Sequence, residues 1–180
     1  GLGDVYKRQG RGKLSNQTAE DGALFGRVKY TGLPGLELAA SLIWEANLSQ
    51  SVPGVDVGGG FLSEFHAIYN HEIGPGTFQG RALYSRWDID TNIQGADSQY
   101  GWYVEPAYKI PTSIGDVGMY GRYSKLDYYR SKELKRAIYE GGVNWWLHEK
   151  VVFKADYFYQ DGQENFSHGH GFNLGLGYEF

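Results

Sequence analysis

Cysteine is absent from the 180 residues of this chain, and methionine occurs only once. Disulfide bonds and thiolate metal sites are therefore excluded. A strong charge of one sign is lacking too, since 17 basic residues stand against 21 acidic ones and give a formal net charge of −4. The charges are scattered along the sequence, so we expect no nucleic-acid partner.

Long apolar runs are also lacking. No stretch approaches the roughly 18 apolar residues that a membrane helix needs, and the mean hydropathy is −0.48. Hydropathy alone therefore indicates a soluble protein, but this criterion tests only helices. A strand of a membrane barrel alternates lipid-facing and water-facing side chains, so it averages out as polar. Glycine and aromatic residues, by contrast, are abundant, with 27 Gly, 15 Tyr and 5 Trp.

Alternation of apolar and polar side chains is the main pattern in the sequence. Along residues 36–47, Leu38, Leu42 and Trp44 fall on one side of an extended chain, whereas Glu37 and Glu45 fall on the other. This period of two predicts β-strands, and a tilted strand of about 9–11 residues crosses a bilayer. Five segments show the pattern clearly: 36–47, 99–110, 136–147, 150–160 and 172–180. Four more show it weakly, which makes nine in all: 22–31, 61–71, 77–88 and 116–128.

The connections between these segments alternate in character. Short turns, most of them with Gly and Pro, are followed by longer and more polar loops. Outer-membrane barrels have short periplasmic turns and longer external loops, so we predict that all the short turns lie on one side. The short turns are 32–35, 72–76, 111–115 and 148–149, and the longer loops are 48–60, 89–98, 129–135 and 161–170.

Aromatic side chains gather near both ends of the apolar faces. Amphipathic rings prefer the two interfaces of a membrane, so the sequence predicts two aromatic belts with small aliphatic residues between them. The periplasmic belt contains Tyr30, Tyr69, Tyr108, Trp145 and Tyr178, and the external belt contains Trp44, Tyr84, Trp102, Tyr123, Tyr157 and Tyr159.

The last segment ends in a distinctive set of residues. Phe180 is preceded by Tyr178, Gly175 and Asn173 on an alternating strand. This arrangement resembles the C-terminal assembly signal of bacterial outer-membrane barrels, which the insertion machinery reads as the last strand. The resemblance implies that these four residues bind the barrel-assembly machinery.

Together these patterns predict an all-β fold, a partial antiparallel up-and-down transmembrane β-barrel. We expect a curved sheet with an unpaired edge at residues 22–31. Residues 1–9 (GLGDVYKRQ) resemble a translated adapter sequence and are excluded as non-native, and no signal peptide is visible. Residues 10–21 are interpreted as the remnant of an upstream loop or strand. Residues 22–180 are then the C-terminal part of a single barrel domain.

The chain after Gln9 resembles the C-terminal part of a Gram-negative porin of the phosphate-selective O and P type. The likeness is carried by GRVKYTGLPGLELAASLIWEANLSQ (26–50), QYGWYVEPAYKI (99–110), GGVNWWLHEKVVFKADYFYQ (141–160) and the closing FNLGLGYEF (172–180). The resemblance implies a water-filled barrel of about sixteen strands, of which nine are present. It also implies a homotrimer in the bacterial outer membrane, surrounded by lipid, with no cofactor and no catalysis.

Passive diffusion of small hydrophilic solutes or ions follows from that resemblance, with a preference for anions or phosphate as in some members of the family. The family's arginine and lysine ladder lies partly on N-terminal strands and inward-folded loops, which this sequence does not contain. The charged residues of the polar faces are predicted to line the pore, and their signs are mixed: Arg27, Lys29, Glu37, Glu45, Glu64, Arg81, Glu105, Lys109, Arg122, Arg136, Glu140, Lys154 and Asp156.

Other functions have less support in the sequence than a channel. His148, His168 and His170 could suggest a metal, but no third ligand stands at a persuasive spacing, and no GxSxG nucleophile motif occurs. We therefore predict neither metal site nor enzyme. The alternatives are a smaller outer-membrane barrel acting as an enzyme or adhesin, or a soluble lipocalin-like barrel, which would need apolar faces pointing inward around a ligand.

Overall fold

The structure is a computed structural model, and it describes residues 22–48, 58–92, 95–128, 135–162 and 168–179. Its described part is one antiparallel sheet in which each strand pairs with the next along the chain. The nine predicted strands are confirmed: β1 (Ala23–Leu33), β2 (Leu36–Glu45), β3 (Gly60–Ile73), β4 (Gly76–Ile89), β5 (Ser98–Thr112), β6 (Gly115–Asp127), β7 (Lys135–His148), β8 (Val151–Gly162) and β9 (Gly169–Tyr178). No helix among the described residues has the length and apolar character to span a membrane.

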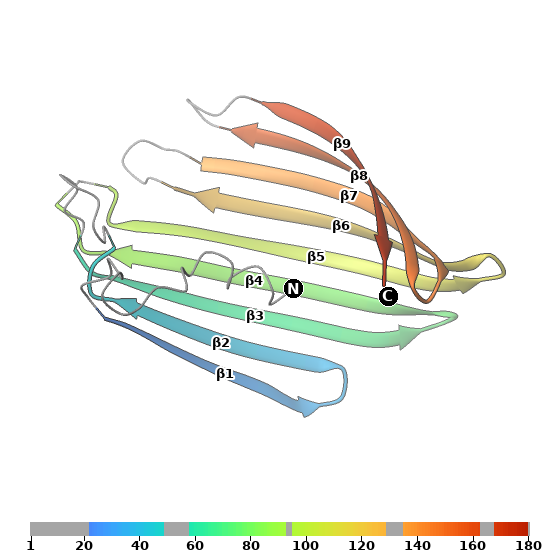
Figure 1. The fold of residues 1–180 in the computed structure, drawn as a ribbon, viewed down its shortest axis with the longest axis horizontal. Helices are drawn as coiled ribbons and strands as arrows, with labels where there is room; N and C mark the ends of the chain where they lie inside the picture. The colour runs from blue at the N-terminus through green and yellow to red at the C-terminus, as the bar shows by residue number, and fades with distance from the viewer. Residues whose placement is uncertain (1–21, 49–57, 93–94, 129–134, 163–167, 180) are drawn as a thin grey trace, which may run out of the picture.

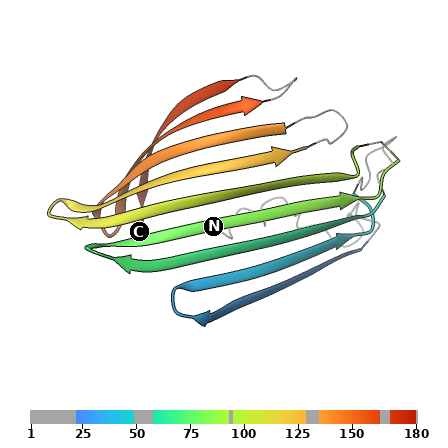
Figure 2. The ribbon, with the colours of Figure 1, turned by 180° about the vertical axis from the view of Figure 1, so that it is seen from behind.

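Figures 1 and 2 show a single curved sheet whose strands lie side by side in chain order, with β1 and β9 at opposite edges. Among the residues that the structure describes, the expected unpaired edge at β1 is present. Within the described residues β9 leaves a second unpaired edge, because β1 and β9 do not pair. A closed barrel of about eight or nine strands has an interior that side chains fill. Such a closed interior would not suit this sheet, because one of its faces carries charged side chains, and charged groups are costly to pack without water.

The four short connections lie at one end of the sheet, and the strand ends that precede and follow the longer connections lie at the other, as Figure 1 shows. Glycine makes three of the short turns possible, because Gly35, Gly74 and Gly115 have φ values of 76°, 59° and 107°. This left-handed region is strained for residues with a Cβ atom. The alternation of turns and loops predicted from the sequence therefore corresponds to two ends of one sheet.

The largest difference from the predicted boundaries is in the last strand. Strand β9 begins at Gly169 rather than Phe172, because its pairing with β8 continues to Gln160 opposite Gly169. Gly171 makes this extension possible, because a Cβ atom at residue 171 would lie only 2.4 Å from the ring of Phe158. The predicted domain pieces 1–9 and 10–21 lie outside the described residues.

Candidate functional site

Alternate residues of a strand point to opposite faces of a sheet, and the pairing register extends both faces across all nine strands. One face, here called the charged face, contains all the predicted pore-lining residues. They lie on it from β1 to β8: Arg27, Lys29, Glu37, Glu45, Glu64, Arg81, Glu105, Lys109, Arg122, Arg136, Glu140, Lys154 and Asp156.

The centre of the charged face is a row of alternating charge across β4–β7. Arg81 pairs with Glu105 across β4 and β5, and Arg122 pairs with Glu140 across β6 and β7. Arg122 joins the two halves, because its Nε donates to Glu105 Oε2 at 2.7 Å and its Nη2 donates to the same oxygen. Two longer ion pairs complete the row, Arg81 Nη1 to Glu105 Oε1 and Arg122 Nη1 to Glu140 Oε2, both 3.6 Å. The Arg122 guanidinium also lies 4.9 Å from the centre of the Tyr103 ring.

A second cluster occupies β1–β3 of the same face. Lys29 Nζ donates to Glu37 Oε2 at 2.9 Å across the first hairpin. His66 lies between two carboxylates, with Nε2 3.4 Å from Glu37 Oε1 and Nδ1 3.7 Å from Glu64 Oε1. A lysine, an imidazole and two carboxylates therefore alternate across these three strands.

Toward the short turns, Lys109 forms a third group. Its Nζ lies 2.7 Å from Asp116 Oδ2 and 4.8 Å from the centre of the Trp146 ring. Further across the same face, between β8 and β9, Asn173 donates to Asp156 Oδ2 at 2.6 Å. These contacts fix several polar groups at the wall of a recess of about 690 Å³, which Arg81, Glu105, Arg122 and Lys154 also line.

The remaining predicted residues lie on the charged face outside these clusters. Arg136 donates to Gln160 Oε1 at 3.2 Å and to the Tyr128 hydroxyl at 3.4 Å, near the end with the longer loops. Within the described residues, Arg27, Glu45 and Lys154 form no ion pair.

Several polar residues of the charged face were missed in the sequence. His66 is two residues from Glu64, and Asp116 and Tyr120 are six and two residues from Arg122. Residues an even number apart lie on the same face of a strand, so this period predicts all three on the charged face. His66 and Tyr120 carry no formal charge at pH 7, and Asp116 is the first residue of its predicted segment, so the pattern of charged residues along the polar faces did not include them. Trp146 lies opposite Trp145 by the same period of two, next to Asp116 on the charged face, but an apolar ring does not mark a polar face in the sequence.

The opposite face, here called the apolar face, exposes large hydrophobic side chains. Leu42 and Val104 are each 44% exposed, and Leu174 is 76% exposed. Near the end with the longer loops, aromatic rings follow one another across the strands. Trp102, Tyr123, Tyr139 and Tyr159 have centroid separations of 5.3, 5.0 and 6.3 Å in turn. A large part of each of these side chains is thus left uncovered by protein, as expected of lipid-facing residues.

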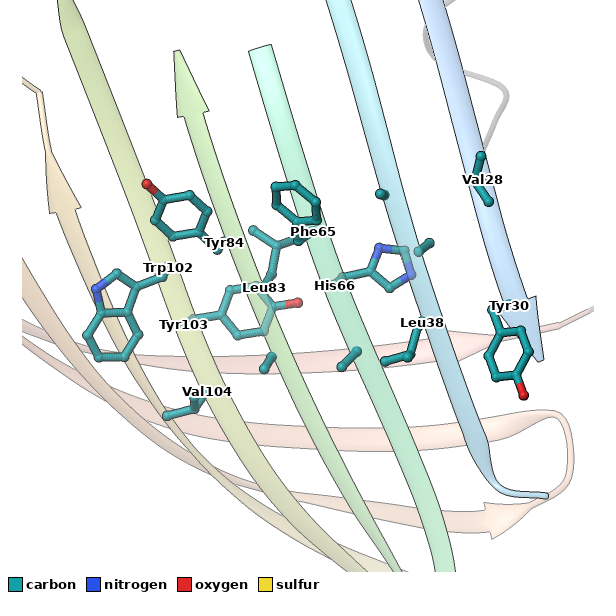
Figure 3. A pocket seen from close by; sticks show the side chains of 14 residues that line it. Val28, Tyr30, Leu38, Phe65, His66, Leu83, Tyr84, Trp102, Tyr103 and Val104 are labelled. Atoms are coloured by element: carbon teal, nitrogen blue, oxygen red, sulfur yellow. The ribbon is translucent and has the colours of Figure 1, made fainter. Parts of the chain in front are cut away.

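Polar atoms of the aromatic residues at the other end bond to the short turns. The Tyr108 hydroxyl donates to the Ile73 carbonyl at 2.5 Å, and Trp145 Nε1 donates to the Ile114 carbonyl at 2.9 Å. Between the two groups of rings is a shallow apolar depression with small residues such as Ala67 and Ala82. Figure 3 shows Phe65, Tyr84 and Trp102 around it on neighbouring strands. Hydrophilic solutes would not bind to such a surface.

His168 and His170, considered in the sequence as metal ligands, have one polar and one aromatic neighbour in turn. His168 Nδ1 lies 3.0 Å from Asp161 Oδ1, with both side chains exposed. His170 packs against the Tyr157 ring at 6.1 Å. Across the described parts of the chain, no group of three or more His, Cys, Asp or Glu side chains could hold a metal ion.

An up-and-down antiparallel sheet with one apolar and one charged face, short turns at one end and longer loops at the other, is the wall of a porin-type β-barrel. The model of the family "Phosphate-selective porin O and P" matches residues 52–180. This is more than half of the chain, so the chain belongs to the phosphate-selective porin O and P family. The family consists of outer-membrane channels rather than enzymes. Comparisons with curated proteins and with solved structures give no match.

Proposed function

We propose that these nine strands form the C-terminal part of the wall of a water-filled channel in the bacterial outer membrane. Small hydrophilic solutes and ions would diffuse through it passively, and family membership favours anions such as phosphate. The observation that carries the proposal is the division of the sheet into an apolar face and a charged face along all nine strands.

The charged face is the proposed pore wall, and the thirteen residues predicted from the sequence would meet the solute or set the field that acts on it. Rings of charged side chains give channels their ion preference. Charges in a lumen also require water, because dry burial of so many would be too costly. The interleaved ion pairs at Glu37, Glu105 and Asp116 fit a wet wall with structured local charge.

The alternatives are not favoured. A lipocalin-like barrel would enclose its apolar face around a ligand, whereas here the apolar face carries aromatic rings at both ends and the charged face carries the recess. An outer-membrane enzyme or adhesin is not favoured because the family consists of porins.

Assembly follows from the same proposal. The apolar face would contact outer-membrane lipid, and a homotrimer would form as the resemblance implies. Strand β9 would be the segment read by the barrel-assembly machinery, with Tyr178 on the apolar face, Asn173 and Gly175 on the charged face, and Phe180 outside the described residues.

Conductance of the full-length protein in a planar lipid bilayer tests the channel. Purified trimers or monomers added to one chamber should give discrete current steps whose size rises with salt concentration, because ions cross through water. A heat-denatured sample is the control. Protein that inserts fully folded into vesicles and gives no current steps would contradict the proposal.

A further inference from the structure

One carboxylate on the charged face is far less exposed than its neighbours. The side chain of Glu105 is 7% exposed, whereas those of Arg81 and Arg122 on either side are 44% and 32% exposed. Side chains directly opposite each other on neighbouring strands are close enough to interact. Glu105 therefore lies beneath and between two guanidinium groups that reach further out from the sheet.

The contacts of Glu105 use both of its oxygens. Oε2 accepts from Nε and Nη2 of Arg122, and Oε1 lies 3.6 Å from Nη1 of Arg81. Arg122 also faces Glu140 at 3.6 Å. The row Arg81–Glu105–Arg122–Glu140 consequently contains two positive and two negative charges and has no net charge.

The recess next to this row would be strongly basic without Glu105. Its lining includes four basic residues, Arg81, Lys109, Arg122 and Lys154, and two acidic ones, Glu105 and Asp156. Lys154 forms no ion pair within the described residues, and the two arginines share Glu105. Glu105 is therefore the carboxylate that both arginines contact, and Arg122 has a second one in Glu140.

We propose that Glu105 sets the ion preference of this wall, by neutralising Arg81 and Arg122 and so keeping them from acting as an anion site. This inference rests on the proposed channel function. The physical reason is that an anion approaching either guanidinium meets the negative field of Glu105, which is fixed between them by charge-assisted hydrogen bonds.

Glu105→Gln is the informative substitution because glutamine keeps the size of the side chain and one oxygen that can accept from Arg122. The charge is lost, so the row gains a net positive charge and the recess becomes more basic. The experiment uses the full-length channel in planar bilayers under a KCl gradient, and the reversal potential gives the ratio of anion to cation permeability. We expect Glu105→Gln to raise this ratio roughly two- to tenfold and to make the chloride current sensitive to added inorganic phosphate.

The matched control is Glu64→Gln, which removes one negative charge from the same face. The contact of Glu64 is with His66 at 3.7 Å rather than with an arginine, so this variant releases no guanidinium. It should change the permeability ratio less and should not produce phosphate block. The double variant Glu105→Gln with Arg81→Gln restores the charge balance of the row and should return the ratio to that of the unmodified channel.

Arg81→Gln alone provides a second measurement that does not depend on folding of the Glu105 variant. It leaves the row with a net negative charge, so the permeability ratio should shift toward cations. An unchanged ratio in Glu105→Gln or in Arg81→Gln, or an equal shift in Glu64→Gln, would overturn the inference while the channel itself stands. An unmodified protein that does not conduct would overturn the proposed function and the inference together.

Discussion

At the scale of single residues, the charged face is organised by cross-strand neighbours. Lys29 and Glu37 meet across the first short turn, and Lys109 and Asp116 meet across the third. Exposed pairs of this kind contribute about 0–1 kcal/mol each to stability. Their main effect is on local charge, because each pair neutralises a cation that would otherwise face the proposed lumen.

Glycine on the charged face provides space for rings that lie flat against the sheet. A Cβ atom at residue 142 would come within 2.5 Å of the Tyr120 ring and 2.9 Å of the Asp156 Cβ atom. At residue 118 it would come within 2.8 Å of the Trp146 ring. The aromatic side chains therefore cover glycine backbone rather than project into the proposed lumen.

Gly142→Val tests this packing. The added side chain would displace the Tyr120 ring, and overpacking of this kind costs about 1–3 kcal/mol. We expect the free energy of unfolding, measured by urea titration of the folded protein in lipid vesicles, to fall by that amount.

The neighbouring Gly141→Ala is the matched control. Residue 141 is on the apolar face, where the nearest atom to an added Cβ is the Tyr120 carbonyl oxygen at 3.8 Å. Its free energy of unfolding should therefore change little. Equal losses in the two variants would show that the ring over Gly142 is not the cause.

At the scale of elements, each hairpin combines a tight turn with strands of two-residue periodicity. Gly35 shows how closely the elements approach, since a Cβ atom there would lie 2.2 Å from the Asn70 carbonyl oxygen on β3. The Gly35 carbonyl also accepts from the Asn70 amide at 2.8 Å. The first turn is thus bonded to the next hairpin, and this bond helps to set the register of β2 against β3.

The terminal strand provides a prediction at this scale. Tyr178→Ala combined with Phe180→Ala should lower the amount of folded protein in the outer membrane several-fold, because the assembly machinery would no longer recognise the last strand. The measurement is heat-modifiable migration of the membrane fraction on a gel. Tyr139→Ala with Phe153→Ala, also on the apolar face, is the control, and an equal loss there would contradict a specific role for the terminal residues.

At the scale of the whole molecule, the two unpaired edges indicate a sheet that is open. Exposed edges pair readily with other strands, and a membrane barrel must close because lipid offers no hydrogen-bond partners. We therefore expect further strands of the full-length protein to pair with the edges at β1 and β9 and to close the sheet into a barrel. Only a barrel with more strands than these nine would leave room for water along the charged face.

The five tryptophans test the orientation of the entire sheet. The register places Trp44, Trp102 and Trp145 on the apolar face, and Trp87 and Trp146 on the charged face. In single-tryptophan variants of the full-length protein in vesicles, brominated lipid should quench the fluorescence of the first three. Aqueous acrylamide should preferentially quench the other two.

Trp145 and Trp146 form the strictest comparison because they are adjacent in the sequence. Similar lipid quenching of both would contradict the assignment of the two faces. The reverse result, with Trp146 in contact with lipid, would place the charged face outside and remove the basis for a channel.

The period-two pattern was sufficient to predict the strands, because a half-buried strand must alternate its side chains whatever it packs against. Leu42 beside Ser41, and Val104 beside Glu105, already indicated which face was apolar. Glycine and proline marked the short turns for an equally local reason, since only particular residues adopt those backbone angles. Boundaries such as the start of β9 at Gly169 were not predictable, because they depend on pairing with β8.

The sequence by itself determined the strand order, the two faces and the residues available to a pore, because each follows from local periodicity and turn chemistry. Only the tertiary structure decided which charges meet. Arg81, Glu105, Arg122 and Glu140 are on four strands, and their alternation in one row follows from the register of three separate pairings. The physical reason is that electrostatic interactions depend on distances of a few ångströms between strands, and those distances exist only once the sheet has formed.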